Sequence, residues 1–535
     1  MTGKNQMLIR RRSFIAGSAL ALAAPALLRA QTAPAASATL RAVMHADLRS
    51  FDPFWTTTYI TSYHGSMVYD TLFGKDEQGN VKPQMVDSYT MSDDGLNFRF
   101  TLREGLAFSD GTPVRAADCV ASLKRFCVRD VAGQLLWPRI KTLRALDDRS
   151  FELVLGEYFG LTLETLAKTS SCAFIMREQD AMVDPNEQIT EIVGSGPFLF
   201  NREATQMGAR YVYDRNPNYV PRTEAPSGTT GSKEVYLERV IWENIGDAQT
   251  ALSALAAGEI DFYENPPLDF VSDLQANPDL SLTVLNTAGT TGVYRLNHLH
   301  PPFNDVRARQ AMLHLVNQAE VMAGAFGPSE FTNTTSSFFG ENTPMTNREN
   351  IGWFEQGQNI ELAAKLFKEA GYDGRPVVIL QPTDIPVINT AAQFAAQWLR
   401  QAGVNAELAV SDWGAIVTRR SVKAAPEDGG WNIFPTYTAS IGDPILFPGH
   451  AAGGAEKAWF GWPDNPKQEA LRTDWTLART QEGRVEVAKK MQANGWDFVP
   501  HVYYGQWKQP CAMRTNVSGL VKVPDLVPFW NMKKA

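Results

Sequence analysis

A regular alternation of apolar and polar positions runs through residues 96–103 of the chain. Such a period-two pattern indicates a strand with one buried face. Turn-forming residues at 93–95 precede this strand, and those at 109–113 follow a second, shorter strand that is predicted at 106–108. A helix is then expected to begin near Arg115. The apolar positions of the first strand are Leu96, Phe98, Phe100 and Leu102.

The second half of the chain alternates between helical spacing and short apolar runs. The spacing predicts a helix over 359–370, a strand over 377–380 and a further helix that ends at Gly403. This order is typical of an α/β unit with parallel strands. The Asn-Pro pair at 465–466 favours another helix start, and the run 500–504 is expected to be a strand that returns the chain to its first half.

Length and composition are those of a globular protein with two large lobes. At 535 residues the chain exceeds the size of one ordinary domain. Hydrophobic residues make up 44% and charged residues 20%, and the mean hydropathy is −0.23. These values argue against an integral membrane protein.

The first thirty residues form a targeting segment. Three consecutive arginines at 10–12 precede a broken apolar run at 14–28, which is a twin-arginine export pattern. The alternative is an anchoring helix, although the run is short for a bilayer span. We expect cleavage after Ala30, with Ala36 or Ala38 as alternative sites.

Charge and cysteine positions refine this picture. Removal of the targeting segment removes five basic residues and no acidic one, so the net charge moves from −8 to −13. An acidic surface of this kind argues against nucleic acid or anionic membrane as a partner.

No cysteine lies near the expected cleavage site, because the first is Cys119. We therefore expect a periplasmic protein without a lipid anchor.

The cysteines are expected to be unpaired and buried. Cys119 and Cys127 lie on one predicted helix, about 12 Å apart at 1.5 Å per residue, which is too far for a disulfide between them. A bridge from either of them to Cys172 remains open in an oxidising compartment. The fourth cysteine is Cys511.

Several motifs carry a resemblance to one family. Residues 94–103 read DGLNFRFTLR, and residues 108–118 read FSDGTPVRAAD. Further matches are VGSGPF at 193–198, YDRNPNY at 213–219 and LNHLHPPFNDVRARQA at 296–311. In sequence and in order, these motifs resemble those of the periplasmic dipeptide, oligopeptide and nickel-binding receptors of ABC importers, the family 5 extracellular solute-binding proteins. Arg115 departs from the family's usual threonine, which removes a side-chain cap from the following helix.

The resemblance implies an α/β fold of the two-lobed periplasmic binding protein type (type II), with three domains and non-contiguous lobes. It implies solute capture for an inner-membrane ABC permease and its ATPase by a monomer without catalysis, cofactor or metal. A hydrolase on such a scaffold, or a chaperone-like holder of extended chains, is the alternative. The implied division is a signal peptide at 1–30, lobe 1 at 39–82, 190–288 and 499–535, an inserted small domain at 83–189, and lobe 2 at 289–498.

The ligand site is expected around residues 431–444, WNIFPTYTASIGDP. Peptide-binding relatives resemble this stretch and hold the peptide's ammonium group with an aspartate, because a buried cation needs a paired anion. That position falls on Ser440 here, which predicts weak binding of free peptide N-termini, unless Asp443 takes the role. The expected ligand-binding residues are Trp55, Thr57, Tyr59, Trp413, Tyr437, Ser440 and Asp443.

Other chemistry is disfavoured by the sequence. His298 and His300 alternate as metal ligands on a strand do, but they lie in the Pro-Pro-Phe connection, which is a plain loop in the family. Ser195 lies in Gly-Ser-Gly-Pro, which lacks the spacing of a nucleophile elbow. No phosphate-binding G-x-x-x-x-G-K-[ST] motif occurs. The ATPase of any importer is therefore expected to be another chain.

Overall fold

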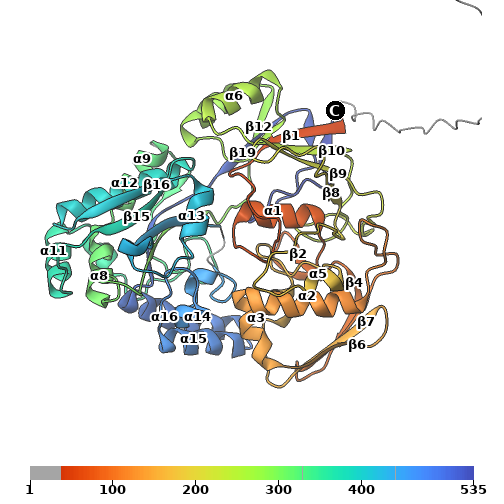
Figure 1. Ribbon diagram of the computed structural model, residues 1–535, viewed down its shortest axis with the longest axis horizontal. Coiled ribbons are helices and arrows are strands. Elements are labelled where there is room, and N and C mark those ends of the chain that lie inside the picture. Colours follow the sequence, from red (N-terminus) through yellow and green to blue (C-terminus); the bar gives the residue numbers. More distant parts are fainter. Residues whose placement is uncertain (1–37, 328, 440–441) are drawn as a thin grey trace, which may run out of the picture.

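The computed structural model describes residues 38–327, 329–439 and 442–535. In these residues the strands form three large sheets and two short strand pairs. Figure 1 shows the sheets as separate bodies around a common centre. The seven-stranded sheet and its helices are called the first lobe, the six-stranded sheet and its helices the second lobe, and the four-stranded sheet with its helices the small domain.

The first lobe contains a mixed sheet in the order β12-β19-β11-β1-β10-β9-β8. Its central strand β1 runs parallel to both of its neighbours, β10 and β11. Helix α1 packs against β8, and α6 packs against β11. The elements are β1 Thr39–Val43, α1 Tyr59–Val68, β8 Phe198–Phe200, β9 Arg210–Arg215, β10 Arg239–Glu243, α6 Ala248–Ala257, β11 Phe262–Tyr263, α7 Val271–Ala276, β12 Leu280–Val284 and β19 Pro510–Arg514.

The second lobe contains a sheet in the order β14-β18-β13-β17-β15-β16. Strands β15 and β16 are parallel, and α12 lies between them in the chain and packs on both. The elements are β13 Thr290–Leu296, α8 Val306–Leu315, α9 Gln318–Phe326, β14 Thr332–Asn333, α10 Gly352–Gln356, α11 Ile360–Glu369, β15 Val377–Pro382, α12 Pro386–Gln401, β16 Ala406–Ser411, α13 Trp413–Arg419, β17 Ile433–Thr438, α14 Gly454–Lys457, α15 Pro466–Leu477, α16 Gln481–Phe498 and β18 His501–Trp507.

The small domain is built on an antiparallel sheet in the order β4-β5-β7-β6. Helix α2 packs on β6 and β7, and short helices continue from it. The elements are β4 Val86–Met91, β5 Asn97–Leu102, α2 Ala116–Arg129, α3 Val131–Leu136, β6 Ile140–Ala145, β7 Ser150–Leu155, α4 Thr162–Leu166 and α5 Glu178–Ala181. The short pairs are β2 Phe73–Lys75 with β3 Val81–Pro83, and β20 Val517–Ser518 with β21 Lys533–Lys534.

Most elements predicted from periodicity form where they were expected. Strand β5 buries Phe98, Phe100 and Leu102, whereas Arg99 is exposed and Thr101 is partly exposed. Helix α2 follows Arg115, and the carboxylate of Asp118 accepts a hydrogen bond of 2.7 Å from the Arg115 backbone N–H. The missing side-chain cap is thus offset by a carboxylate at the positive end of the helix.

Two local predictions were wrong. The expected strand at 106–108 is a single bridge between Ala107 and Pro113, because the chain turns again before a ladder can form. The expected return strand, β18, belongs to the second lobe instead, since it pairs with β13 from Thr290 to Arg295. The chain crosses back to the first lobe after β18, at 508–509, and enters the first sheet with β19.

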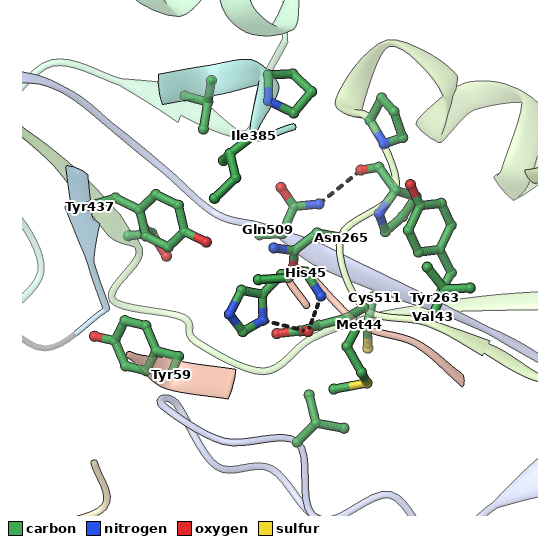
Figure 2. A pocket seen from close by; sticks show the side chains of 18 of the residues that line it. Val43, Met44, His45, Tyr59, Tyr263, Asn265, Ile385, Tyr437, Gln509 and Cys511 are labelled. Atoms are coloured by element: carbon green, nitrogen blue, oxygen red, sulfur yellow. Dashed lines mark hydrogen bonds and ion pairs between the residues drawn. The ribbon is translucent and has the colours of Figure 1, made fainter. Parts of the chain in front are cut away.

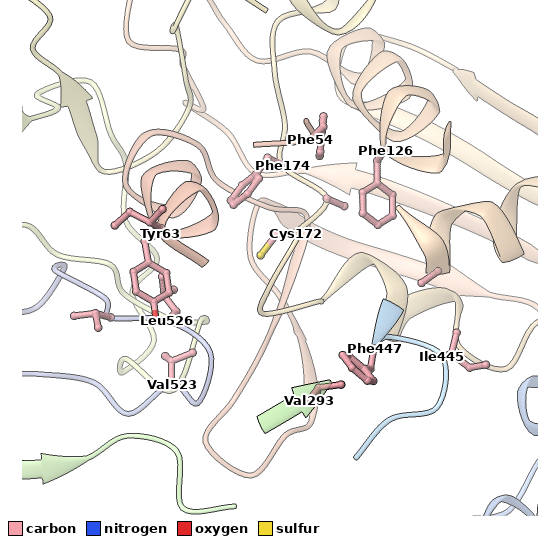
Figure 3. Close-up of a cluster of buried hydrophobic side chains, with 14 of the residues drawn as sticks. Phe54, Tyr63, Phe126, Cys172, Phe174, Val293, Ile445, Phe447, Val523 and Leu526 are labelled. Atoms are coloured by element: carbon pink, nitrogen blue, oxygen red, sulfur yellow. The ribbon is translucent and has the colours of Figure 1, made fainter. Parts of the chain in front are cut away.

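One large cluster of buried side chains joins all three parts of the molecule. Figure 3 shows part of it, with Phe126 of the small domain, Tyr63 of the first lobe and Val293 of the second lobe. The four cysteines are buried and unpaired in the described part of the chain, which confirms the expectation of free thiols. No helix among the described residues is long and apolar enough to span a membrane.

Candidate functional site

A cavity of about 360 Å³ lies between the first and second lobes. The first lobe contributes the segment after β1, at 43–49, and the segment after β11, at 263–267. The second lobe contributes the segment after β15, at 384–387, and the end of β17. Figure 2 shows Tyr59 and Tyr437 on one side of this space, with His45, Asn265 and Gln509 beyond them. The carboxyl ends of strands in α/β sheets are where ligands bind most often.

A smaller cavity of about 70 Å³ adjoins the larger one. His45, Tyr59 and Tyr437 line both cavities, so the two spaces share a wall. The smaller cavity is rich in hydroxyl and aromatic groups, and no aspartate or glutamate of the described residues lines it. Its remaining lining residues are Thr57, Thr58, Lys168, Ser170, Ser171, Trp413, Arg420, Thr436, Thr438, Leu446, Phe447, Pro448 and Trp459.

Tyr59 connects the two lobes directly. It is the first residue of α1, and its hydroxyl accepts a hydrogen bond of 2.8 Å from the backbone N–H of Ala439. The same hydroxyl lies 3.2 Å from Oγ1 of Thr438. Burial raises the pKa of Tyr59, so the phenol stays protonated at neutral pH. A neutral hydroxyl therefore joins the lobes at the wall shared by the two cavities.

A buried carboxylate, Glu264, faces the larger cavity directly after β11. It accepts hydrogen bonds from the backbone N–H of His45 at 2.8 Å and from the hydroxyl of Tyr63 at 3.0 Å. Nδ1 of His45 also lies 2.8 Å from the carboxylate. Burial and the charge of Glu264 raise the pKa of Tyr63. The sequence prediction missed Glu264, although its position after a strand at the end of the motif EIDFYE was a usable signal.

A buried guanidinium, Arg420, lines the smaller cavity. It directly follows α13 and is 3% exposed. Its Nη2 donates a hydrogen bond of 3.2 Å to Oγ1 of Thr56 in the first lobe. Burial lowers the pKa of Arg420 to about 9, so the side chain is still charged at neutral pH. The sequence prediction missed this residue, because nothing in the run RRS indicates that the second arginine turns inward.

The structure brings together four of the residues predicted to bind ligand. Tyr59 and Tyr437 line both cavities, and Thr57 and Trp413 line the smaller one. In addition, Nε1 of Trp459 donates a hydrogen bond of 3.3 Å across the lobes to Oγ1 of Thr57. The binding role of these side chains stays a prediction.

Two other predicted residues lie outside both cavities. Trp55 stacks under the guanidinium of Arg129, 4.8 Å from the ring centre. Asp443 uses its carboxylate locally, accepting hydrogen bonds of 2.8 and 3.0 Å from the backbone N–H groups of Ile445 and Leu446. Ser440 lies outside the described residues.

The residues weighed for other chemistry have structural contacts. His298 and His300 direct Nε2 to different backbone carbonyls, those of Pro500 and Lys423, at 3.4 and 2.8 Å. The hydroxyl of Ser195 donates to the Ile175 carbonyl and accepts from the Asp70 N–H, both at 3.2 Å. Each group has a local hydrogen-bonding role in the described part of the chain.

Comparisons with known proteins agree on one family. Residues 80–456 match the profile of the bacterial extracellular solute-binding proteins, family 5 Middle. This chain belongs to that family. A probable peptide ABC transporter periplasmic-binding protein of Sinorhizobium fredii is 45% identical over 532 residues, 98% of this chain and 99% of the relative. The family assigned from the sequence motifs is thereby confirmed.

Solved structures show the same fold. A dipeptide-binding protein from Pseudoalteromonas sp. SM9913, in complex with Met-Leu, has a TM-score of 0.77 at 18% identity, covering 93% of this chain and 100% of that one. The periplasmic binding protein AgaA from A. tumefaciens R10, in complex with agropinic acid, has a TM-score of 0.77 at 20% identity, covering 93% and 99%. The two-lobed α/β fold is confirmed, and the chain is a solute-binding receptor of an ABC importer.

Proposed function

We propose that this family 5 protein captures a peptide-like or other small polar solute between its lobes and delivers it to an inner-membrane ABC permease and its ATPase. The observation that carries the proposal is the cavity of about 360 Å³ that both lobes line. Its walls combine aromatic rings with a few buried polar groups, which is the usual make-up of a small-molecule site. The 45% identical relative is named for peptide transport, which supports a peptide-like ligand.

Capture by closure follows from how the chain is connected. Two segments link the lobes in sequence, 285–289 between β12 and β13, and 508–509 between β18 and β19. Short crossings of this kind are where hinge motions occur. A ligand that contacts both lobes binds more tightly to the closed form, in which the lobes touch. This difference in affinity drives closure. The cross-lobe hydrogen bonds of Tyr59 would then add to the ligand's own contacts.

The amine of a free peptide would find no aspartate at position 440. Loss of one partner from a buried ion pair costs about 3–5 kcal/mol, or some two to four decades in affinity. We therefore expect weak binding of free di- and tripeptides and preference for ligands whose amine is blocked or missing. Ser440→Asp should raise the affinity for free peptides. Micromolar binding of free dipeptides by the wild type would show that another acid, Asp443 or Glu264, holds the amine.

The proposed cellular setting is the periplasm. The twin-arginine pattern at 10–12 lies outside the described residues, and it supports export of a folded protein. We propose that the exported chain acts as a monomer, with lobe 1 at 39–82, 190–288 and 508–535, a small domain at 83–189 and lobe 2 at 289–507. The pairing of β18 supports moving the last crossing to 508–509.

Mass spectrometry of the solute that co-purifies with the protein, followed by calorimetric titration with that solute, tests the function. We expect one-to-one binding without chemical change. Incubation with peptides should give no product, and turnover would contradict a receptor role. Broad affinity for unfolded proteins in place of a discrete solute would favour a chaperone-like holder.

A further inference from the structure

The guanidinium of Arg420 has fewer hydrogen-bond partners than those of the other deeply buried arginines in the described chain. Arg295 and Arg309 also lack an ion pair in this part of the chain, but each donates two hydrogen bonds to backbone carbonyls. Arg125 pairs with Asp52 at 2.8 Å, and Arg472 pairs with Glu469 at 2.8 Å. Arg420 is equally buried, yet no carboxylate of the described residues lies within ion-pair distance of it. Among the described residues, Nε of Arg420 has no hydrogen-bond partner, and the guanidinium donates one hydrogen bond, to the hydroxyl of Thr56.

Aromatic rings surround the guanidinium instead of acids. The central guanidinium carbon, Cζ, lies 4.5 Å from the ring centre of Phe460, 5.5 Å from that of Phe434 and 5.8 Å from that of Trp459. These contacts stabilise a cation but give the guanidinium N–H groups no acceptor, and the described residues supply one, the Thr56 hydroxyl. Burial of a charge without an anion is costly, so proteins keep such groups chiefly where they act.

The cavity beside Arg420 suits an anion. No acidic residue of the described chain lines it, and eight of its lining residues carry hydroxyl groups. Its second cation, Lys168, is already paired with Asp130. The acidic groups Asp47, Glu264 and Asp384 line the larger cavity instead. The two adjoining spaces therefore differ in charge: the smaller one presents a guanidinium without an ion pair among the described residues, and the larger one presents carboxylates.

We propose that Arg420 binds a carboxylate group of the transported solute, with that group in the smaller cavity and the body of the solute in the larger one. A planar guanidinium matches a carboxylate with two parallel hydrogen bonds, which fixes orientation as well as charge. The space of about 70 Å³ admits such a group but not a whole peptide. The assignment rests on the proposed function, because it names the chemical class of ligand for the same cleft.

The test uses calorimetric titration with N-acetylated dipeptides in three forms: the free C-terminal acid, the C-terminal amide and a phosphate ester of the same size. We expect the wild type to bind the acid about 10- to 100-fold more tightly than the amide, the range of charge-assisted hydrogen bonds. Arg420→Met should bind the acid as weakly as the amide, so that the preference for the acid is lost.

Two controls separate recognition from structure. Thr56→Val removes the hydroxyl that Arg420 contacts across the lobes and should keep the preference for the acid. Without ligand, Arg420→Met should melt at the wild-type temperature or above, since a buried unpaired charge is removed. Arg125→Met should melt lower, since it leaves Asp52 without its partner.

The outcomes distinguish this inference from the proposed function. Equal binding of acid and amide by the wild type would overturn the role of Arg420 and leave the receptor function intact. Tighter binding of the phosphate ester than of the acid would overturn the carboxylate assignment. Failure of all three forms and of unblocked peptides to bind would contradict the proposed peptide-like function, and with it this inference.

Discussion

Replacement of Tyr59 by phenylalanine should weaken ligand binding without disturbing the fold. The substitution removes the hydroxyl that accepts from the Ala439 N–H at 2.8 Å and lies 3.2 Å from Thr438 Oγ1. Two hydrogen bonds at about 0.5–1.5 kcal/mol each give a loss of about 1–3 kcal/mol. Both bonds cross between the lobes, so their loss destabilises the closed form, in which the lobes touch. The affinity for the ligand should fall about 5- to 150-fold.

Tyr69 offers a matched control at the other end of the same helix. It follows α1, is 1% exposed, and its hydroxyl has no hydrogen-bond partner in the described structure. Tyr69→Phe should leave the affinity unchanged and the free energy of unfolding equal or higher. Calorimetric titration of both variants with the co-purified solute measures the difference. Wild-type affinity in Tyr59→Phe, or an equal loss in Tyr69→Phe, would refute the closure argument.

Three further predictions concern export, closure and pH. Arg11→Lys with Arg12→Lys should keep the protein in the cytoplasm, and normal periplasmic recovery on cell fractionation would exclude the twin-arginine route. Binding should change tryptophan fluorescence, because tryptophans line both cavities, and raise the melting temperature by mass action; flat signals at saturation would contradict a closing cleft. Burial lowers the pKa of His64 and of His450 to about 3. Unfolding lets these rings take up protons below their usual pKa of 6.5, so the melting temperature should fall between pH 7 and pH 5, and no change would refute this linkage.

Local patterns were sufficient to predict individual elements. The alternation in β5 and the spacing in α11 and α12 follow from which side of one element is buried, and this is encoded within about ten residues. The sheet that receives a strand is not encoded in this way. Strand β18 reads as an apolar run in the sequence, but its partners β13 and β14 lie more than 150 residues earlier. The prediction that this strand returns the chain to the first lobe was wrong because its pairing depends on these distant partners.

The candidate site was predicted only in part, because its walls are formed by residues that lie far apart in the sequence. Tyr59 and Tyr437 stood out as aromatic residues among uncharged neighbours, and the structure brings them to one wall. Trp55 has the same local appearance but stacks on Arg129, which a local pattern does not reveal. Arg420 was missed because an ordinary charged residue becomes informative only once its burial and its partners are known. Glu264 was missed although its position after a strand was a usable signal.

Hydrogen–deuterium exchange with and without the co-purified solute tests most directly the claim that the ligand binds between the lobes. The account predicts that backbone amides of both cavity walls gain protection together: residues 43–49 and 263–267 of the first lobe, and residues 384–387 and 437–439 of the second. Protection confined to one lobe, or located away from these segments, would contradict it.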